Sequence, residues 1–288
     1  ANNMKFYKFC ISILIFLSQV WADAASFDTN ATLRLSAYDA SAKQLLLYDK
    51  SGEIKLFDAA KFEIKFTQKY SYNEISALAF NEGKIYLAFA GSEIIVLDSE
   101  LKFLKALKTG RSETASIDAI YAAEGAIYAL INKNELIKFE PAMSEPRKIS
   151  LGYGRINALG FSAEGLCLAG WSKSVRCFDK DLNLIKEFKQ NSIGTALAYC
   201  ANGETLYLGD IDGNFINLKS DEKKSLGSWI KAIVCVEDTQ FIATRDKIYK
   251  NTKKDVKEEL DLKSEFLAMY ADGNSVIVID RSGKIYKF

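Results

Sequence analysis

The sequence of 288 residues contains 38 Lys and Arg, 37 Asp and Glu, five Cys, two Pro and no His. A net charge this close to zero provides no long-range attraction to nucleic acid or to anionic lipid. The absence of His excludes Ser-His-Asp and Cys-His nucleophiles, and the scarcity of Pro argues against long disordered linkers.

Residues 1–24 have the form of a secretory signal peptide. Lys5 and Lys8 precede an apolar run over 9–20, and Ala22-Asp23-Ala24 supplies a small-residue cleavage site. The run is shorter than the about 20 apolar residues of a membrane span, although an uncleaved anchor is the alternative. We expect export to the periplasm and a mature chain, residues 25–288, with no membrane span and no net charge.

A glycosylation signal follows the predicted cleavage site. Asn30 and Thr32 form the N-x-[ST] pattern, with Asp28 two residues before the Asn. This arrangement resembles the extended bacterial sequon, which implies that Asn30 is a sugar acceptor. Such short patterns also arise by chance.

From residue 33 onward, a set of short strand signals recurs seven times with a period of about 36–42 residues, which is typical of stacked repeat architectures. The clearest copy has apolar strands at 77–80, 85–87 and 94–98, separated by polar or Gly turns. The seven first-strand signals lie at 36–38, 77–80, 119–121, 158–161, 196–199, 232–235 and 267–270.

The ends of the repeat array predict a closed ring. The seventh unit stops one strand short at Phe288, whereas the first unit is preceded by a spare strand at about residues 30–33. Pairing the two would remove an exposed sheet edge, and the polar capping repeats of an open solenoid are not visible. We therefore expect an all-β fold in residues 25–288: a seven-bladed β-propeller of four-stranded antiparallel blades, closed by the N-terminal strand.

The strand ends Phe57-Asp58, Leu97-Asp98 and Phe178-Asp179 make the chain resemble WD40-like and quinoprotein-like propellers. Without His, the Gly-His dipeptide and the His-containing hydrogen-bond chain of WD40 repeats are missing. The Trp-docking motif of pyrroloquinoline quinone enzymes is missing as well. The resemblance therefore implies an architecture without the chemistry of either family.

Two local patterns have more than one interpretation. Asp210-Ile211-Asp212-Gly213-Asn214 resembles a calcium loop, but its Gly is at position four rather than six, and Asp-Gly favours a hairpin turn. The four Cys after the signal segment lie on predicted strands as two pairs, Cys167 with Cys177 and Cys200 with Cys235. They are either disulfides of an oxidising compartment or buried free thiols.

Binding residues are expected on loops at one end of the central channel, because rigid blades present variable loops there. Aromatic and Arg side chains, which are enriched at interfaces, mark a candidate docking face on these loops. They are Tyr70, Tyr72, Arg111, Tyr153, Arg155, Trp171 and Trp229. The alternative for each ring is a place in the core between blades.

A polar column precedes the inner-strand Ala of most repeats and would line the channel mouth. Its members are Ser36, Ser76, Asp118, Asn157, Thr195 and Lys231. Asp118, Asn157 and Lys231 are the candidate ligand-binding positions among them.

These observations favour a monomeric, non-enzymatic periplasmic accessory protein that binds a protein partner and no cofactor, metal or nucleic acid. In size, signal segment and degenerate blades, the chain resembles the NapL-type accessory propellers of periplasmic nitrate reductase systems. That resemblance implies a role in maturing the reductase or supplying it with electrons. The alternatives are an envelope assembly scaffold and a metal-dependent lactonase- or lyase-like propeller enzyme.

Overall fold

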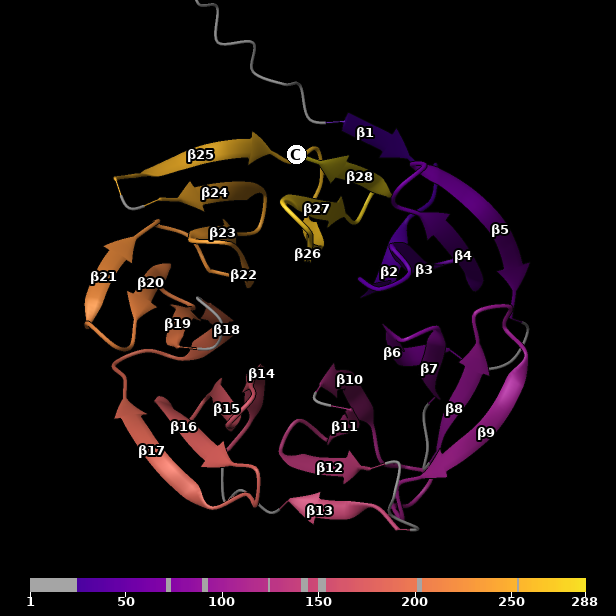
Figure 1. Cartoon of the computed structure of the whole chain (residues 1–288), viewed down its shortest axis with the longest axis horizontal. Helices are drawn as coiled ribbons and strands as arrows, with labels where there is room; N and C mark the ends of the chain where they lie inside the picture. Colours follow the sequence, from indigo (N-terminus) through magenta and orange to yellow (C-terminus); the bar gives the residue numbers. More distant parts are fainter. Residues whose placement is uncertain are drawn as a thin grey trace, which may run out of the picture.

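A computed structural model describes residues 25–70, 74–89, 93–123, 125–140, 145–149, 154–200, 204–252 and 254–288. The expected signal segment and the candidates Tyr72 and Tyr153 lie outside these ranges. The described residues form seven four-stranded antiparallel sheets arranged in a ring (Figure 1), which confirms the predicted all-β propeller.

The first four blades follow one another along the chain. Blade 1 contains β2 (Leu33–Asp39), β3 (Gln44–Asp49), β4 (Glu53–Asp58) and β5 (Glu63–Lys69). Blade 2 contains β6 (Ile75–Asn81), β7 (Lys84–Phe89), β8 (Glu93–Asp98) and β9 (Phe103–Lys108). Blade 3 contains β10 (Ile117–Ala123), β11 (Ala126–Ile131), β12 (Glu135–Phe139) and β13 (Arg147–Ile149). Blade 4 contains β14 (Ile156–Ser162), β15 (Gly165–Gly170), β16 (Ser174–Asp179) and β17 (Leu184–Lys189).

The last three blades complete the ring. Blade 5 contains β18 (Gly194–Cys200), β19 (Thr205–Asp210), β20 (Asn214–Asn217) and β21 (Glu222–Ser225). Blade 6 contains β22 (Ala232–Val236), β23 (Thr239–Ala243), β24 (Lys247–Asn251) and β25 (Val256–Asp261). Blade 7 contains β26 (Phe266–Asp272), β27 (Ser275–Asp280) and β28 (Lys284–Lys287), together with β1 (Ala25–Asp28).

The N-terminal strand closes the ring as predicted, but it lies earlier in the sequence than the expected residues 30–33. β1 pairs antiparallel with β28, with Ala25 opposite Lys287. Asn30 has a positive φ of 53°, so the strand ends before it, and Leu33 already begins the inner strand of blade 1. The exposed Asn30 lies in the turn between these strands, and its backbone N–H donates to Asp28 Oδ1 at 2.8 Å.

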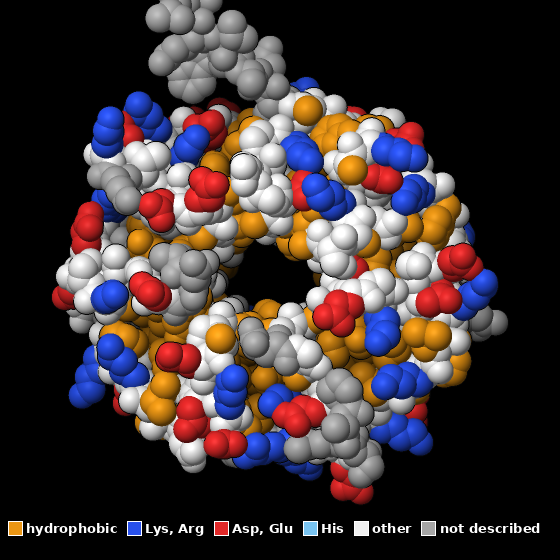
Figure 2. Space-filling model, viewed as in Figure 1, with side chains coloured by type: hydrophobic (Ala, Val, Ile, Leu, Met, Phe, Trp, Pro, Cys, Tyr) orange, Lys and Arg blue, Asp and Glu red, His pale blue; other side chains and the backbone are white. Residues whose placement is uncertain are grey.

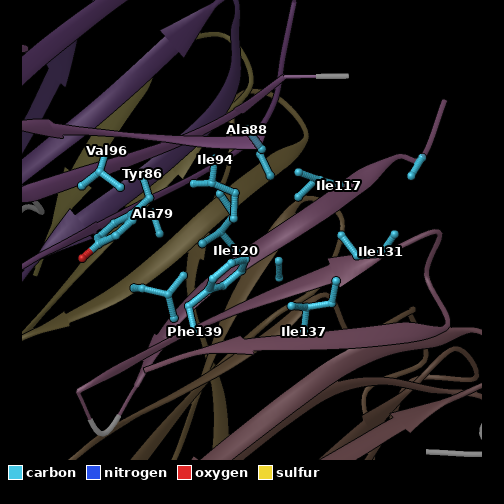
Figure 3. Close-up of a cluster of buried hydrophobic side chains, with 14 residues drawn as sticks. Ala79, Tyr86, Ala88, Ile94, Val96, Ile117, Ile120, Ile131, Ile137 and Phe139 are labelled. Carbon is cyan, nitrogen blue, oxygen red and sulfur yellow. The ribbon is translucent and has the colours of Figure 1, made fainter. Parts of the chain in front are cut away.

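Apolar side chains fill each of the seven spaces between neighbouring blades. Between blades 2 and 3, for example, Ala88 and Ile94 face Ile117, Ile131 and Ile137 (Figure 3). All five are fully buried, and burial of each Ile contributes about 1.5–3 kcal/mol. The core is thus spread around the ring, which leaves the two ends of the channel to the loops.

The acid that ends the third strand of several repeats has a structural role. Asp58, Asp98 and Asp179 each accept, through Oδ1, a backbone N–H of the turn that follows; the donors are Lys61 at 3.0 Å, Lys102 at 2.9 Å and Asn183 at 2.8 Å. These carboxylates hold tight turns between the two outer strands, as Asp side chains commonly do.

Candidate interaction surface

The loops that enter the inner strands and those that join the two middle strands lie at the same end of the channel. The antiparallel register requires this, since the first residue of an inner strand pairs with the last residue of the next strand, as Ile156 does with Gly170. We call this end the entry face. Its loops surround a central channel that is open through the ring (Figure 2).

Two of the predicted docking residues contribute mainly to the fold. The Tyr70 ring packs against the core between blades 1 and 2, and this burial raises the pKa of its hydroxyl. Arg111 forms an ion pair with Glu135 in blade 3. For Tyr70 the interpretation as a core ring therefore holds, and the charge of Arg111 is neutralised within the protein.

The two tryptophans are exposed on the entry face. Trp171 is 56% exposed in the turn between β15 and β16, and Trp229 is 43% exposed in the loop between β21 and β22. Each lies beside a cation: the Arg155 guanidinium is 5.8 Å from the centre of the Trp171 ring, and Lys231 Nζ is 3.1 Å from that of Trp229. Cations at these positions are attracted by the indole face.

Hydrogen bonds connect the two tryptophan sites through blade 5. The Trp171 N–H donates to the Arg155 carbonyl at 2.9 Å, and the Asn157 side-chain amide donates to the Gly194 carbonyl at 3.0 Å. Three further hydrogen bonds continue across blade 5. The Ile211 N–H donates to the Ile193 carbonyl at 3.0 Å, and the Ile230 N–H donates to the Asp210 carbonyl at 3.2 Å. The Thr195 hydroxyl donates to the Ile230 carbonyl at 2.6 Å. Trp171 and Trp229 therefore belong to one continuous arc.

Ile211 was not predicted as a surface residue, yet it is 40% exposed on this arc. It occupies the Asp210-Ile211-Asp212-Gly213-Asn214 segment, which forms the turn between β19 and β20. Asp210 Oδ1 accepts the Asn214 N–H at 2.8 Å, and Gly213 has a φ of 82°. Asp49 and Asp280 accept equivalent i+4 N–H groups in the turns between β3 and β4 and between β27 and β28, so this segment is a hairpin turn of a kind that recurs in the described blades.

The predicted polar column needs one correction. In six described inner strands the register shifts at the second residue, which is left unpaired as a bulge. This residue is Asp118 in blade 3 and Asn157 in blade 4, as predicted, but Arg34 rather than Ser36 in blade 1. Ser36 instead pairs with Leu47, and its hydroxyl is 2.8 Å from that of Tyr270 in blade 7.

Most of the column's polar groups are engaged within the protein. Asp118 accepts the Lys133 N–H at 2.7 Å and the Ser116 hydroxyl at 2.8 Å, and Asn157 bonds to blade 5 as described above. Lys231 is in a different environment from these groups. Burial lowers the pKa of its ammonium group, Glu265 raises that pKa, and Arg245 and Arg281 lower it. Lys231 therefore lies among positive charges at the channel mouth.

Arg245 and Arg281 were missed by the sequence analysis. The signal was present in the distribution of arginines, because five of the seven in the sequence belong to entry-face segments: Arg34, Arg111, Arg155, Arg245 and Arg281. Ion pairs with Glu74, Glu135 and Glu265 engage Arg34, Arg111 and Arg281. Among the described residues, no carboxylate lies within salt-bridge distance of Arg155 or Arg245.

The four described cysteines form two disulfides. Cys167 and Cys177 lie directly opposite each other on β15 and β16, with Cα atoms 4.0 Å apart. Cys200 and Cys235 join the inner strands of blades 5 and 6, with Cα atoms 5.6 Å apart. The second bond joins the two blades at the end of their inner strands that lies away from the entry face.

Neither a metal centre nor a membrane span is found in the part of the chain that the structure describes. It contains no group of three or more Cys, Asp or Glu side chains placed to hold a metal ion. Nor does it contain a helix that is long and apolar enough to cross a membrane.

Comparisons with known proteins identify the fold alone. No protein-family model matches the sequence, and no curated protein matches it either. Among solved structures, the chain is similar to the crystal structure of the computationally designed Ika8 protein, with a TM-score of 0.65 and 16% sequence identity over 85% of this chain and 80% of that one. An identity this low shows the fold and carries no functional information.

Proposed function

We propose that the protein is a non-catalytic accessory module that binds a protein partner through an exposed arc of the entry face, in the periplasm. We define this docking arc as Arg155, Trp171, Ile211, Trp229 and Lys231. The observation that carries the proposal is the exposure of Trp171 and Trp229, each beside a cation, on connected loops of neighbouring blades. Tryptophan and arginine dominate interface hot spots.

The arc is suited to binding because its backbone is already fixed. Pre-organised loops lose less conformational entropy on association than loops that must fold around a partner. The hydrogen bonds across blade 5 support such an arrangement, and the disulfide between Cys200 and Cys235 joins blades 5 and 6 at the opposite end of their inner strands. The same disulfides agree with export to an oxidising compartment, and the partner that we propose is a periplasmic nitrate reductase system.

Affinity capture from periplasmic extract, followed by mass spectrometry, tests this function. We expect Trp171→Ala combined with Arg155→Ala to reduce capture of the partner by at least about tenfold, without lowering the melting temperature, since hot-spot truncation costs about 2 kcal/mol or more. Phe103→Ala is the matched control, because Phe103 is 64% exposed on the outer strand β9, away from the arc. Equal capture by the double variant and the parent protein would refute the proposal.

Metal analysis separates this function from the enzyme alternative. The accessory module is expected to purify without a stoichiometric metal ion. Calcium retained at one equivalent through dialysis would favour a metal-dependent propeller enzyme, because calcium binds carboxylate and carbonyl oxygens of the kind that surround propeller channels.

A further inference from the structure

Cations gather beside the docking arc, on neighbouring loops at the channel mouth of blades 6 and 7. Lys231, Arg245 and Arg281 are close enough for each arginine to act on the Lys231 charge, and Glu265 acts on that charge in the opposite direction. Glu265 lies 3.7 Å from Arg281 Nε, so it is shared with that arginine. Lys231, Arg245 and Arg281 thus lie at the channel mouth of blades 6 and 7, where Glu265 pairs with Arg281 and Asp246 follows Arg245 in the same turn.

The backbone brings these groups together. The Lys231 N–H donates to the Ala243 carbonyl at 2.7 Å, and the Phe266 N–H donates to the Arg245 carbonyl at 2.7 Å. The Arg281 N–H donates to the Glu265 carbonyl at 2.8 Å. The three cations thus extend from the end of the docking arc, where Lys231 contacts Trp229, to the neighbouring loops of blades 6 and 7.

Like charges held together in this way repel one another, and a bound anion relieves that repulsion. Arg281 is paired with Glu265, as Arg34 and Arg111 are with Glu74 and Glu135, whereas no carboxylate of the described residues lies within salt-bridge distance of Arg245. The exposed Trp229 and Ile211 next to the cations provide an apolar surface as well. The site combines concentrated positive charge with an adjoining apolar strip.

We propose that Lys231, Arg245 and Arg281 bind carboxylates of an acidic segment of the protein partner, while Trp229 and Ile211 contact an apolar side chain of the same segment. This inference rests on the proposed docking function. Charge complementarity identifies the occupant: carboxylates accept hydrogen bonds from ammonium and guanidinium groups, and arginine binds them bidentately. A protein segment fits better than single-stranded nucleic acid, because a nearly neutral chain lacks the continuous basic groove that follows a phosphate backbone.

Fluorescence anisotropy with three labelled probes tests the inference on the intact protein. The probes are a peptide of alternating Glu and Leu, the same peptide with Gln in place of Glu, and oligo-dT. We expect the Glu peptide to bind, to bind more weakly as salt is raised, and to bind better than either other probe. Lys231→Met and Arg245→Gln should each weaken its binding by about tenfold, as expected when a charged hydrogen bond is lost.

Two further variants provide controls. Lys186→Met removes a lysine whose Nζ is 4.4 Å from the centre of the Phe188 ring on the outer strand β17, so it changes charge and a cation–π contact away from the site. It should leave peptide binding unchanged. Lys231→Arg keeps the charge and should retain binding, which separates loss of the charge from loss of the local fold.

Several outcomes would overturn the inference. They are equal binding of the Glu and Gln peptides, stronger binding of oligo-dT, an equal effect of Lys186→Met and Lys231→Met, or no binding of the Glu peptide at about millimolar concentration. None of these affects the partner-capture test on Trp171 and Arg155. A protein that captures its partner through the tryptophans without charge dependence would retain the proposed function and lose this inference.

Discussion

Asp272 is the residue whose substitution most directly tests how the ring is closed. Its carboxylate is 5% exposed at the end of β26 in blade 7. It accepts the Tyr38 hydroxyl of blade 1 at 2.7 Å and the Lys287 ammonium group of β28 at 2.6 Å. Asp272→Asn keeps the size of the side chain but removes the charge that both donors share.

The expected loss of stability follows from these two bonds. Removing one partner of a buried pair costs about 3–5 kcal/mol, but Lys287 is 26% exposed and regains water, so we expect about 2–3 kcal/mol. In a domain of this size each kcal/mol lowers the melting temperature by about 2–4 °C, which gives a decrease of about 4–12 °C. Thermal unfolding followed by circular dichroism at pH 7 measures it.

The pH dependence provides a second readout. Burial raises the pKa of Asp272, but hydrogen bonds from Lys287 and Tyr38 outweigh burial and hold it below its ordinary value. A carboxyl with a lowered folded-state pKa contributes stability that is complete above its unfolded pKa of about 3.9 and is lost as the pH falls through the folded-state pKa. The difference between parent and variant should therefore shrink below about pH 4.

Asp212→Asn is the matched control, since Asp212 is an exposed turn carboxylate and its substitution should change stability by less than about 0.5 kcal/mol. An Asp272→Asn protein that melts with its parent at pH 7 would show that Asp272 does not hold the closure. A difference that persists undiminished at about pH 2 would show that the ionised carboxylate is not its source.

Three more predictions concern the packing of the blades, the disulfides and the surface. Gly209→Ala should lower the free energy of unfolding by about 1–3 kcal/mol, because the added Cβ would lie 2.8 Å from the Cβ of the fully buried Ile230. Gly160→Ala is the control, since the nearest atom to its added Cβ would be 3.4 Å away. Equal urea midpoints for the two variants would contradict this packing argument. The Cys200–Cys235 bond spans 35 residues and should stabilise the fold by about 4 kcal/mol, so reduction should lower the melting temperature. Alkylation of four thiols in the absence of reductant would refute both disulfides. Asn30 should carry a glycan when the protein is isolated from a host with a matching oligosaccharyltransferase, and the Asn30→Gln variant should then have the intact mass of the unmodified polypeptide. A parent protein with the mass of the unmodified polypeptide would refute the sequon.

Much of the fold was predictable because the same physical pattern is repeated seven times. In the copy at 77–98, alternating and β-branched apolar residues separated by Gly and Asn define three strands, and the structure forms β6, β7 and β8 there. The position of the closing strand was less predictable. Residues 25–28 and 30–33 are both short and partly apolar, and the positive φ of Asn30, which keeps the second segment from forming a strand from its first residue, is not visible in the sequence pattern.

The error in the polar column shows the limit of repeat alignment. Ser36 precedes an alanine, as Ser76 does in blade 2, and this similarity placed it in the column. The register aligns Arg34 with Ser76 instead, because Leu35 occupies the position where the other blades carry the small Ala77 or its equivalent. A bulge adds an unpaired residue without leaving a sequence signal of its own. The shift therefore depends on pairing that only the folded sheet displays.

The sequence indicated at which end of the channel the candidate residues lie, but not which of them are exposed there. Tyr70 and Trp171 are both aromatic residues on entry-face segments, yet Tyr70 packs into the core between two blades and Trp171 is 56% exposed. Which ring becomes covered depends on the neighbouring blade, and neighbouring blades are separated by a whole repeat in the sequence. Ile211 was not predicted because a single apolar residue in a turn is no signal of a binding surface, and only its position beside Trp229 in the folded ring places it on the arc.

The near-zero net charge of the sequence also conceals a local separation of charge. Arg34, Arg111 and Arg281 are paired with Glu74, Glu135 and Glu265, whereas Arg245 has no carboxylate of the described residues within salt-bridge distance, and both Arg245 and Arg281 act on the charge of Lys231. Cations that lie close together repel one another, and a bound anion relieves that repulsion. The acidic segment that we propose as the ligand would supply such an anion, so its binding should weaken as salt is raised. The specificity that we propose for this protein then rests on the loops at one end of the channel, while the repeated blades hold those loops in place.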